Sequence, residues 1–295
     1  MKETNRGFRV LAHIVLLTFC VLVAVPFLLL LASSLSSERT LLEHGYALWP
    51  REFSLDAYAY LFRGAGNLFR AYGVTIFVTA IGTALGLLLT TLLAYTLSIK
   101  DLPFRKAMAF LVFFTMLFNG GLVPTYMMYT NTFHIKNSIW ALIFPYLLVN
   151  AFYVIIARSY FSTSIPSEIL EAARIDGAGE VCILFRVVIP MSLPILATLG
   201  LMIGLAYWNN WTNGLYFVTD RSLYSVQQLL TEMVNNMQAL QSGQFANADP
   251  EAIQNLPSTA MRMATAVMSV LPVLLIYPFF QKYFVKGITL GAVKG

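Results

Sequence analysis

Six long apolar runs, separated by shorter polar stretches, constrain the fold of this chain more than any other feature. They cover residues 10–32, 72–99, 107–129, 138–157, 191–208 and 261–280. Each run is close to, or longer than, the length of about 20 residues that a helix needs to cross the hydrocarbon core of a bilayer. Within lipid a helix satisfies its own backbone hydrogen bonds, which an open strand cannot do. The sequence therefore predicts an all-α membrane protein with six transmembrane helices.

The composition agrees with a chain that lies largely in lipid. Hydrophobic residues make up 58% of the 295 residues and charged residues only 11%, whereas charged residues make up about a quarter of a typical soluble domain. The first run is longer than the apolar region of about 7 to 15 residues in a cleaved signal peptide, so we expect it to remain as a helix. Cys20 and Cys182 fall in different predicted compartments, which excludes a disulfide between them.

The basic residues predict which side of the membrane each polar stretch faces. Twelve of the 19 lysines and arginines lie near the two ends of the chain, within residues 100–106, or within residues 158–186. Because basic residues collect on the cytoplasmic side, both termini and the polar loop 159–190 are predicted to be cytoplasmic. The basic residues form no patch, so the net charge of +5 does not indicate a nucleic-acid partner.

We expect the chain to divide at about residue 70. Residues 1–70 hold the first predicted span and an external segment, in which residues 53–62 carry apolar side chains at helical spacing and predict a short interfacial helix. Residues 71–295 are predicted to form a five-helix core with a cytoplasmic loop at 159–190. Its other polar parts are an external loop at 209–259 and a cytoplasmic tail at 281–295.

Groups for catalysis or ion coupling are missing from the sequence. The central parts of the six runs contain no Asp, Glu, Lys or Arg, which an ion-driven carrier normally uses as relays. His13, His44 and His134 share no ligand-like spacing with one another or with the cysteines. There is no Gly-x-x-x-x-Gly-Lys-Ser/Thr loop for a nucleotide. We therefore expect no enzyme, no metal site and no cofactor in this chain.

The loop 159–190 is a polar island with a defined local pattern. The residues from Pro166 to about Asp176 predict a short helix that ends at Gly177, and a second helix is expected from about Gly179 past Pro190. Glutamates on neighbouring turns and two small alanines give the first helix a face on which another protein can dock. The alternative is a plain hydrophilic connection between two spans.

The pattern in this loop resembles the cytoplasmic coupling motif of ABC importer permease subunits. Glu171-Ala172-Ala173 is followed by three residues, Gly177, nine residues, and then Val187-Val188-Ile189-Pro190; Val187 and Ile189 replace the family's usual Ile and Leu. The residues 174–178 are similar to the carbohydrate-uptake branch, in particular to the short permease subunit of the maltose importer. The resemblance implies that the ATPase-coupling residues are Glu168, Glu171, Ala172, Ala173, Asp176, Gly177 and Pro190.

The tail and two internal segments extend the resemblance. The tail 281–295 is similar to that of the short maltose-type subunit, which implies a contact with the ATPase dimer through Gly291, Val293, Lys294 and Gly295. The alternatives for the tail are a solvated end or a segment on the bilayer surface. Residues 119–126 and 208–211 are similar to permeases that handle complex plant or algal oligosaccharides.

Aromatic and amide side chains are suited to binding sugars, because aromatic faces stack on sugar C–H surfaces and amides exchange hydrogen bonds with hydroxyls. The substrate-pathway candidates are Asn119, Tyr126, Tyr207, Trp208, Asn209, Asn210 and Trp211. The alternatives are an interfacial aromatic belt for residues 207–211 and a plain kink for residues 119–124.

The resemblance also implies partners and a location. The expected partners are a second permease subunit in a heterodimer, two cytosolic ATPase subunits that bind ATP and Mg, an extracytoplasmic solute-binding protein, and membrane lipid. The expected location is the bacterial cytoplasmic (inner) membrane, as a multi-pass protein. The alternatives are a membrane scaffold that recruits cytosolic partners, an importer of the same type for a non-sugar solute, and a secondary carrier for an uncharged solute.

Overall fold

Helices make up nearly all of the regular structure. The computed structural model describes residues 6–63, 65–241 and 258–292, and within these residues the only pairing of extended chain is an isolated bridge between Ser36 and Phe53. The expected all-α class is therefore confirmed over the described residues.

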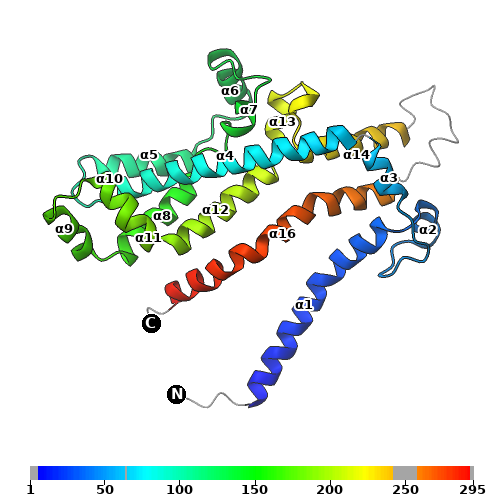
Figure 1. The fold of residues 1–295 in the computed structure, drawn as a ribbon, viewed down its shortest axis with the longest axis horizontal. Coiled ribbons are helices and arrows are strands. Elements are labelled where there is room, and N and C mark those ends of the chain that lie inside the picture. The colour runs from blue at the N-terminus through cyan, green and yellow to red at the C-terminus, as the bar shows by residue number, and fades with distance from the viewer. Residues whose placement is uncertain (1–5, 64, 242–257, 293–295) are drawn as a thin grey trace. The chain divides into compact units, whose positions relative to one another are not determined.

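The elements follow one another as helices of very different length (Figure 1). In chain order they are α1 (Arg6–Ser34), α2 (Glu38–His44), α3 (Asp56–Phe62), α4 (Ala65–Ser98), α5 (Arg105–Leu117), α6 (Leu122–Met127), η1 (Met128–Thr132), α7 (Trp140–Ile143), α8 (Ala151–Ser164), α9 (Ser167–Ile175), α10 (Glu180–Ile183), η2 (Leu184–Val188), α11 (Ile189–Met191), α12 (Leu193–Trp208), α13 (Thr212–Phe217), η3 (Arg221–Leu223), α14 (Val226–Gln241) and α16 (Ser258–Ala292). η1 and η2 are π-helical turns and η3 is a 3₁₀ turn.

The chain forms two compact units. One comprises Met1–Leu68 and Leu229–Pro272, and the other comprises Phe69–Gln228 and Val273–Gly295. Long helices therefore contribute to both units: α4 and α16 each pass from one unit into the other.

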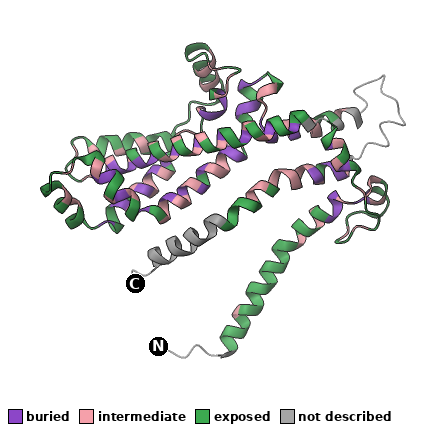
Figure 2. Cartoon of the chain, viewed as in Figure 1, coloured by how far each residue is buried: buried purple, intermediate pink, exposed green. Residues whose placement is uncertain are grey.

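The first unit contains α1 and the short segment with α2 and α3 that follows it. From Val10 to Leu31 α1 is largely apolar on all sides and mostly exposed, whereas its last turn, Ala32 to Ser34, is buried (Figure 2). Such an exposed apolar surface is expected for a helix whose surroundings are lipid. α3 lies within the predicted interfacial helix and buries Ala57 and Leu61.

The Glu38 carboxylate accepts hydrogen bonds from the backbone N–H groups of Thr259 and Ala260, at 2.9 to 3.0 Å and 2.9 Å. It thereby caps the start of α16, where free N–H groups need acceptors.

The second unit is held together by close packing between α4 and α12. A Cβ built at Gly82 of α4 would lie 2.5 Å from the ring of Tyr207, and one at Gly204 of α12 would lie 3.3 Å from the Thr83 hydroxyl. Small residues allow helix backbones to approach in this way within a membrane. Tyr207 also donates a hydrogen bond of 2.9 Å to the carbonyl oxygen of Ile143.

The side chain of Asn137 joins two loops of the second unit. The Asn137 Oδ1 atom accepts hydrogen bonds from the backbone N–H groups of Thr219 and Asp220, at 2.6 and 3.2 Å. The Asn137 backbone N–H donates to the carbonyl oxygen of Phe217. The link before α7 is therefore joined to the loop that follows α13.

Three helices are long and apolar enough to cross a membrane: Gly7–Ser34, Gly66–Ser98 and Thr259–Pro278. Two bent pairs add up to two further candidates. These are Arg105–Leu117 with Leu122–Thr132, bent by 113°, and Glu180–Met191 with Leu193–Trp208, bent by 87°. The described residues thus contain three to five candidate spans, and the predicted number of six is not confirmed.

The fourth predicted span, at residues 138–157, is not one helix. It is divided into α7 and α8 by residues 144–150. Pro145 stands in this break, and Tyr146 has a φ of 64°, which lies outside the range of an α-helix. Asn150 then caps a new helix, since its Oδ1 atom accepts a hydrogen bond of 2.9 Å from the N–H of Phe152.

The third predicted span is interrupted where its glycines suggested a break. α5 ends at Leu117 and α6 begins at Leu122 after Gly121, which has a φ of 85°. α16 continues as a helix through Ala292. The predicted tail at 281–295 is therefore helical over residues 281–292.

Candidate functional site

The polar loop contains the predicted short helix and its glycine stop. α9 spans Ser167–Ile175, and Gly177 follows with a φ of 82°. The N–H of Gly177 donates to the carbonyl oxygen of Arg174, and the N–H of Ala178 donates to that of Ala173, both at 3.0 Å. These paired bonds form a Schellman motif, in which a left-handed residue closes the helix end. Since no atom lies within 4 Å of a Cβ built at Gly177, the backbone conformation alone favours glycine there.

α9 has one face toward the protein and one face open. Leu170, Ala173 and Ala178 pack against a buried cluster. The open face carries the exposed predicted residues Glu168, Glu171, Ala172 and Asp176, together with an isoleucine, Ile175, that is 86% exposed. The open face of α9 is therefore mainly acidic, with the large apolar side chain of Ile175 on it.

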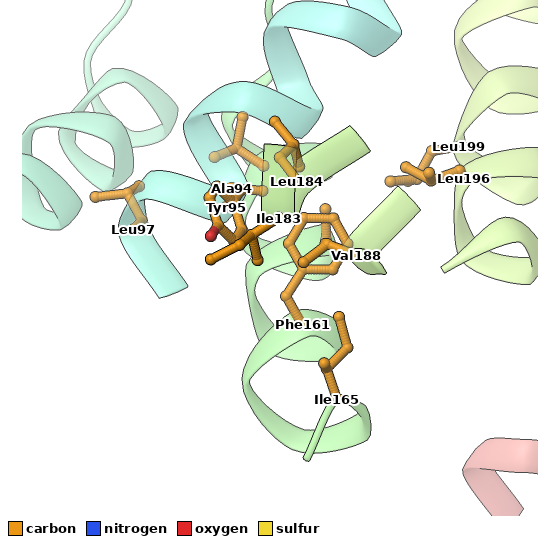
Figure 3. Close-up of a cluster of buried hydrophobic side chains, with 12 residues drawn as sticks. Ala94, Tyr95, Leu97, Phe161, Ile165, Ile183, Leu184, Val188, Leu196 and Leu199 are labelled. Atoms are coloured by element: carbon orange, nitrogen blue, oxygen red, sulfur yellow. The ribbon is translucent and has the colours of Figure 1, made fainter. Parts of the chain in front are cut away.

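The buried cluster beneath α9 joins four parts of the second unit. Its side chains come from α4, from α8 and the residue that follows it, from the segment 183–188 and from α12 (Figure 3). Its members are Ala94, Tyr95, Leu97, Val154, Ala157, Phe161, Ile165, Ile183, Leu184, Val188, Leu196 and Leu199. The loop is therefore seated on a packed base that includes the last turn of α4.

Polar contacts complete this base. Arg174 Nε donates to Glu180 Oε1 at 2.9 Å, and the hydroxyl of Tyr95 donates to Glu180 Oε2. The hydrogen bond to Glu180 raises the pKa of Arg174, so the guanidinium stays charged at any physiological pH. The sequence did not point to Tyr95 or Glu180, because 85 residues separate them. The Arg174 and Glu180 pair was also missed, since the turn at Gly177 stands between them.

The segment after Gly177 follows the prediction with one change. α10, η2 and α11 together form the second helix, but residues 184–188 have π-helical bonding. Pro190, a predicted coupling residue, is exposed and lies in α11. A π turn is a frequent local adjustment in helices at functional positions.

A polar cavity of about 320 Å³ lies along the side of α9 that carries Leu170, Glu171 and Arg174. Lys100, Arg105 and Arg174 supply cations to its lining, and Asp101 and Glu171 supply carboxylates. The cavity between α9 and its base therefore contains charges of both signs.

The predicted substrate-pathway residues do not form one site in this structure. Asn119 is exposed in the break before α6, where its Oδ1 accepts a hydrogen bond of 2.9 Å from the N–H of Gly121. Tyr126 stacks on Phe217, with ring centroids 5.5 Å apart, and its hydroxyl accepts a hydrogen bond from Lys136 Nζ. Asn119 thus lies before α6 and Tyr126 lies within it.

The remaining pathway candidates lie at the end of α12. Tyr207 and Trp208 are buried, being 2% and 4% exposed, whereas Trp211 is 40% exposed. Asn209 donates to the carbonyl oxygen of Leu205, and the Oδ1 of Asn210 accepts a bond from the N–H of Asn213. In this conformation the side chain of Asn209 is hydrogen-bonded to the end of α12, and that of Asn210 is hydrogen-bonded to the turn that follows it.

Trp208 also borders an apolar cavity of about 350 Å³ that is lined by α4, by α12 and by residues 273–277 in the middle of α16. The lining includes Thr79 and Thr83, whose buried hydroxyl oxygens have no hydrogen-bond partner in the described part of the chain. Tyr126 and Tyr207, by contrast, belong to the packed region around Phe217.

The predicted tail contact falls at the edge of the described residues. Gly291 lies within α16, while Val293, Lys294 and Gly295 lie outside the described residues. In the ranges that the structure describes, no three His, Cys, Asp or Glu side chains are placed so that they could hold a metal ion.

Comparisons with known proteins agree on one family. Residues 4–290 match the family described as "Binding-protein-dependent transport system inner membrane component". The chain is 38% identical to the polygalacturonan/rhamnogalacturonan transport system permease protein YtcP of Bacillus subtilis (strain 168), over 99% of both chains. It is 34% identical to protein LplC of the same organism, over 92% of this chain and 89% of the relative.

A solved structure supports the same assignment. It is described as a bacterial ABC transporter involved in the import of the acidic polysaccharide alginate. The match has a TM-score of 0.79 and 26% identity, and it covers 96% of this chain and 99% of that chain. These relatives are membrane components of transporters and not enzymes. The chain therefore belongs to the family of binding-protein-dependent transport system inner membrane components.

Proposed function

We propose that this chain is one of two permease subunits in an ATP-driven importer of oligosaccharides. A solute-binding protein delivers the substrate, and two cytosolic ATPase subunits supply the energy by hydrolysing Mg-bound ATP. The observation that carries the proposal is the α9 hairpin, which is α9 with the turn at Gly177 and α10. Its open face carries exposed acidic residues, an alanine and an isoleucine, and it rests on a packed base, in a chain of this family.

The coupling role of this hairpin rests on its geometry. Glu168, Glu171, Ala172 and Asp176 are exposed, while Ala173 packs inward and Gly177 fixes the turn. A protein groove that covers the open face would bury Ile175, and burial of such a side chain contributes roughly 1.5 to 3 kcal/mol. Pro190 marks the point where the second helix enters the predicted membrane region.

The proposed topology has six spans with both termini in the bacterial cytoplasm. The three to five candidate spans support a multi-pass membrane protein, and the distribution of basic residues supports a cytoplasmic α9. In this arrangement residues 1–70 act as an anchor and an external segment, and residues 71–295 form the core. The external loop 209–259 meets the solute-binding protein, and Gly291, Val293, Lys294 and Gly295 meet the ATPases.

The proposed substrate is an acidic oligosaccharide. Two relatives, at 38% and 26% identity, are named for polygalacturonan/rhamnogalacturonan and for alginate, and galacturonan and alginate are polymers of uronic acids. A relative at 28% identity is named for arabinooligosaccharides, which are neutral. Asn119, Tyr126, Tyr207, Trp208, Asn209, Asn210 and Trp211 remain the proposed pathway residues, and binding would require the hydrogen bonds at Asn209 and Asn210 to rearrange.

The test is ATP hydrolysis by the assembled complex in lipid. The complex is given its solute-binding protein loaded with oligogalacturonides, with alginate oligomers, or with arabinooligosaccharides. The proposal predicts stimulation by an acidic oligosaccharide above that by the neutral one. Stimulation only by the neutral sugar contradicts the substrate class, and absence of stimulation by every loaded binding protein contradicts the importer.

A further inference from the structure

The last turn of α4 forms hydrogen bonds with side chains of three other helices, and a fourth helix is connected to it through one of these side chains. The Leu97 carbonyl oxygen accepts a hydrogen bond from Arg105 Nε of α5 at 2.8 Å and another from Arg158 Nε of α8 at 3.1 Å. Two residues earlier, the Tyr95 hydroxyl donates to Glu180 of α10, which also binds Arg174 of α9. Cations suit this position, because the carbonyl groups at a helix C-terminus carry partial negative charge.

Glu180 is the group that joins α9 to α4. Its Oε1 accepts the Nε–H of Arg174 at 2.9 Å, and its Oε2 accepts the Tyr95 hydroxyl and, at 3.5 Å, a terminal N–H of Arg174. An exposed ion pair contributes little by itself, and Arg174 and Glu180 are each exposed by more than a third. Tyr95 is only 5% exposed, so loss of its carboxylate partner would leave a hydroxyl unpaired in a largely buried position.

α9 needs a polar link of this kind if its displacement is to move the membrane helices. It buries no residue fully, and it is joined to the rest of the second unit by partly buried contacts from Leu170 and Ala173. Without a polar link, a partner that displaces α9 would be free to tilt it over the cluster. With the link, displacement of α9 pulls on α4.

α4 in turn contacts α12 through residues 82–87. The ring of Tyr207 fills the space beside Gly82, and a Cβ built at Gly86 would lie 3.2 Å from the carbonyl oxygen of Leu148 and 3.3 Å from Ile203. At these contacts the side chains leave no room for a closer approach of the two helices, so we expect a shift of α4 at residues 82–86 to displace α12 as well.

We propose that Glu180 is a positioning residue that, with Arg174 and Tyr95, clamps α9 to the end of α4, so that movement of α9 is passed through α4 to α12. The inference rests on the proposed contact between α9 and the ATPases. It adds Tyr95, which lies outside the coupling motif, and two residues at positions that the motif leaves unspecified, and it assigns α4 as the first helix to move.

The first test asks whether the clamp exists, and it needs no partner subunit. Amide hydrogen exchange of residues 167–176 is measured for the full chain in lipid nanodiscs, as wild type, Glu180→Gln and Tyr95→Phe. The matched control is Tyr160→Phe, which removes a hydroxyl from the edge of the same cluster. Loss of a hydrogen bond predicts exchange about fivefold faster in both clamp variants and unchanged in the control. Equal exchange in all four proteins overturns the clamp.

The second test asks whether the clamp couples ATP hydrolysis to transport. The number of labelled oligogalacturonide molecules taken up per ATP hydrolysed is measured with the assembled transporter for Arg174→Glu, for Glu180→Arg and for the double variant. Each single change should lower the ratio by about fivefold, and the double variant should recover most of it, because it restores the ion pair with its charges exchanged. A normal ratio in both single variants overturns the positioning role. A wild-type complex without stimulated hydrolysis instead refutes the proposed function, and the exchange test still decides the clamp.

Discussion

Gly177 is the residue whose role follows most directly from its conformation. The left-handed φ of 82° closes α9, and there is open space where a side chain would be. Sequence pattern alone predicted this stop, because a short helix followed by glycine has a local signature. The residues that hold the helix in place were not predictable, since Tyr95 and Glu180 meet only after the chain has folded.

Replacement of Gly177 by valine should uncouple the transporter without removing it from the membrane. A β-branched residue in the left-handed region costs about 1 to 2 kcal/mol, and this strain would shift or fray the end of α9. Asparagine is the matched control, because it tolerates the left-handed conformation. Stimulated ATP hydrolysis is the measurement: we expect it to fall in Gly177→Val and to persist in Gly177→Asn. Equal stimulation in the two variants would show that the turn has no mechanical role.

Two glycines of α4 should respond in opposite ways to the same substitution. At Gly82 an added Cβ would lie 2.5 Å from the Tyr207 ring, whereas at Gly73 no atom lies within 4 Å. Gly73→Ala should raise stability slightly, because alanine is favoured over glycine in a helix by about 1 kcal/mol. Gly82→Ala should lower stability, because the ring of Tyr207 must move. Thermal unfolding in detergent measures both, and an equal or higher midpoint for Gly82→Ala would contradict the packing of α4 on α12.

At the scale of whole elements, apolar runs located the helices but not their interruptions. The first, second and last runs are continuous helices, as expected, and the third is broken at the glycines before α6. The prediction of one helix over the fourth run was wrong, because it relied on the number of apolar residues. It gave too little weight to Pro145, which interrupts a helix, and to Asn150, which caps a new one. A run of hydrophobic residues reports burial in lipid or protein, and it does not report whether the backbone is continuous.

The start of α16 offers a test of an element held by a distant side chain. Glu38 accepts hydrogen bonds from Thr259 and Ala260, and loss of such a cap costs about 1 kcal/mol. Glu38→Ala should therefore speed amide exchange at residues 259–262 by about fivefold. Glu43→Ala is the control, because Glu43 pairs with Arg39 within α2. Equal protection of residues 259–262 in the two variants would remove the capping role.

For the whole molecule, composition was enough to predict a helical membrane protein, and the resemblance in the loop 159–190 was enough to predict its family. The site was predicted in part, because the α9 residues are consecutive in sequence and the local rules for helices apply to them. The substrate pathway could not be derived in the same way. Tyr126 and Tyr207 pack around Phe217, and Trp208 borders a separate cavity, so their arrangement depends on tertiary contacts and on the conformation.

The central claim is that ATP hydrolysis on partner subunits drives a sugar through a pathway to which this chain contributes. The most direct measurement is uptake of a labelled oligogalacturonide into proteoliposomes that contain the full complex, with the loaded binding protein outside and ATP inside. The account predicts uptake that requires ATP, the binding protein and this chain, and that persists when ionophores remove all ion gradients. Uptake that continues without ATP and stops when the gradients are removed would contradict it, because the chain would then be part of an ion-driven carrier.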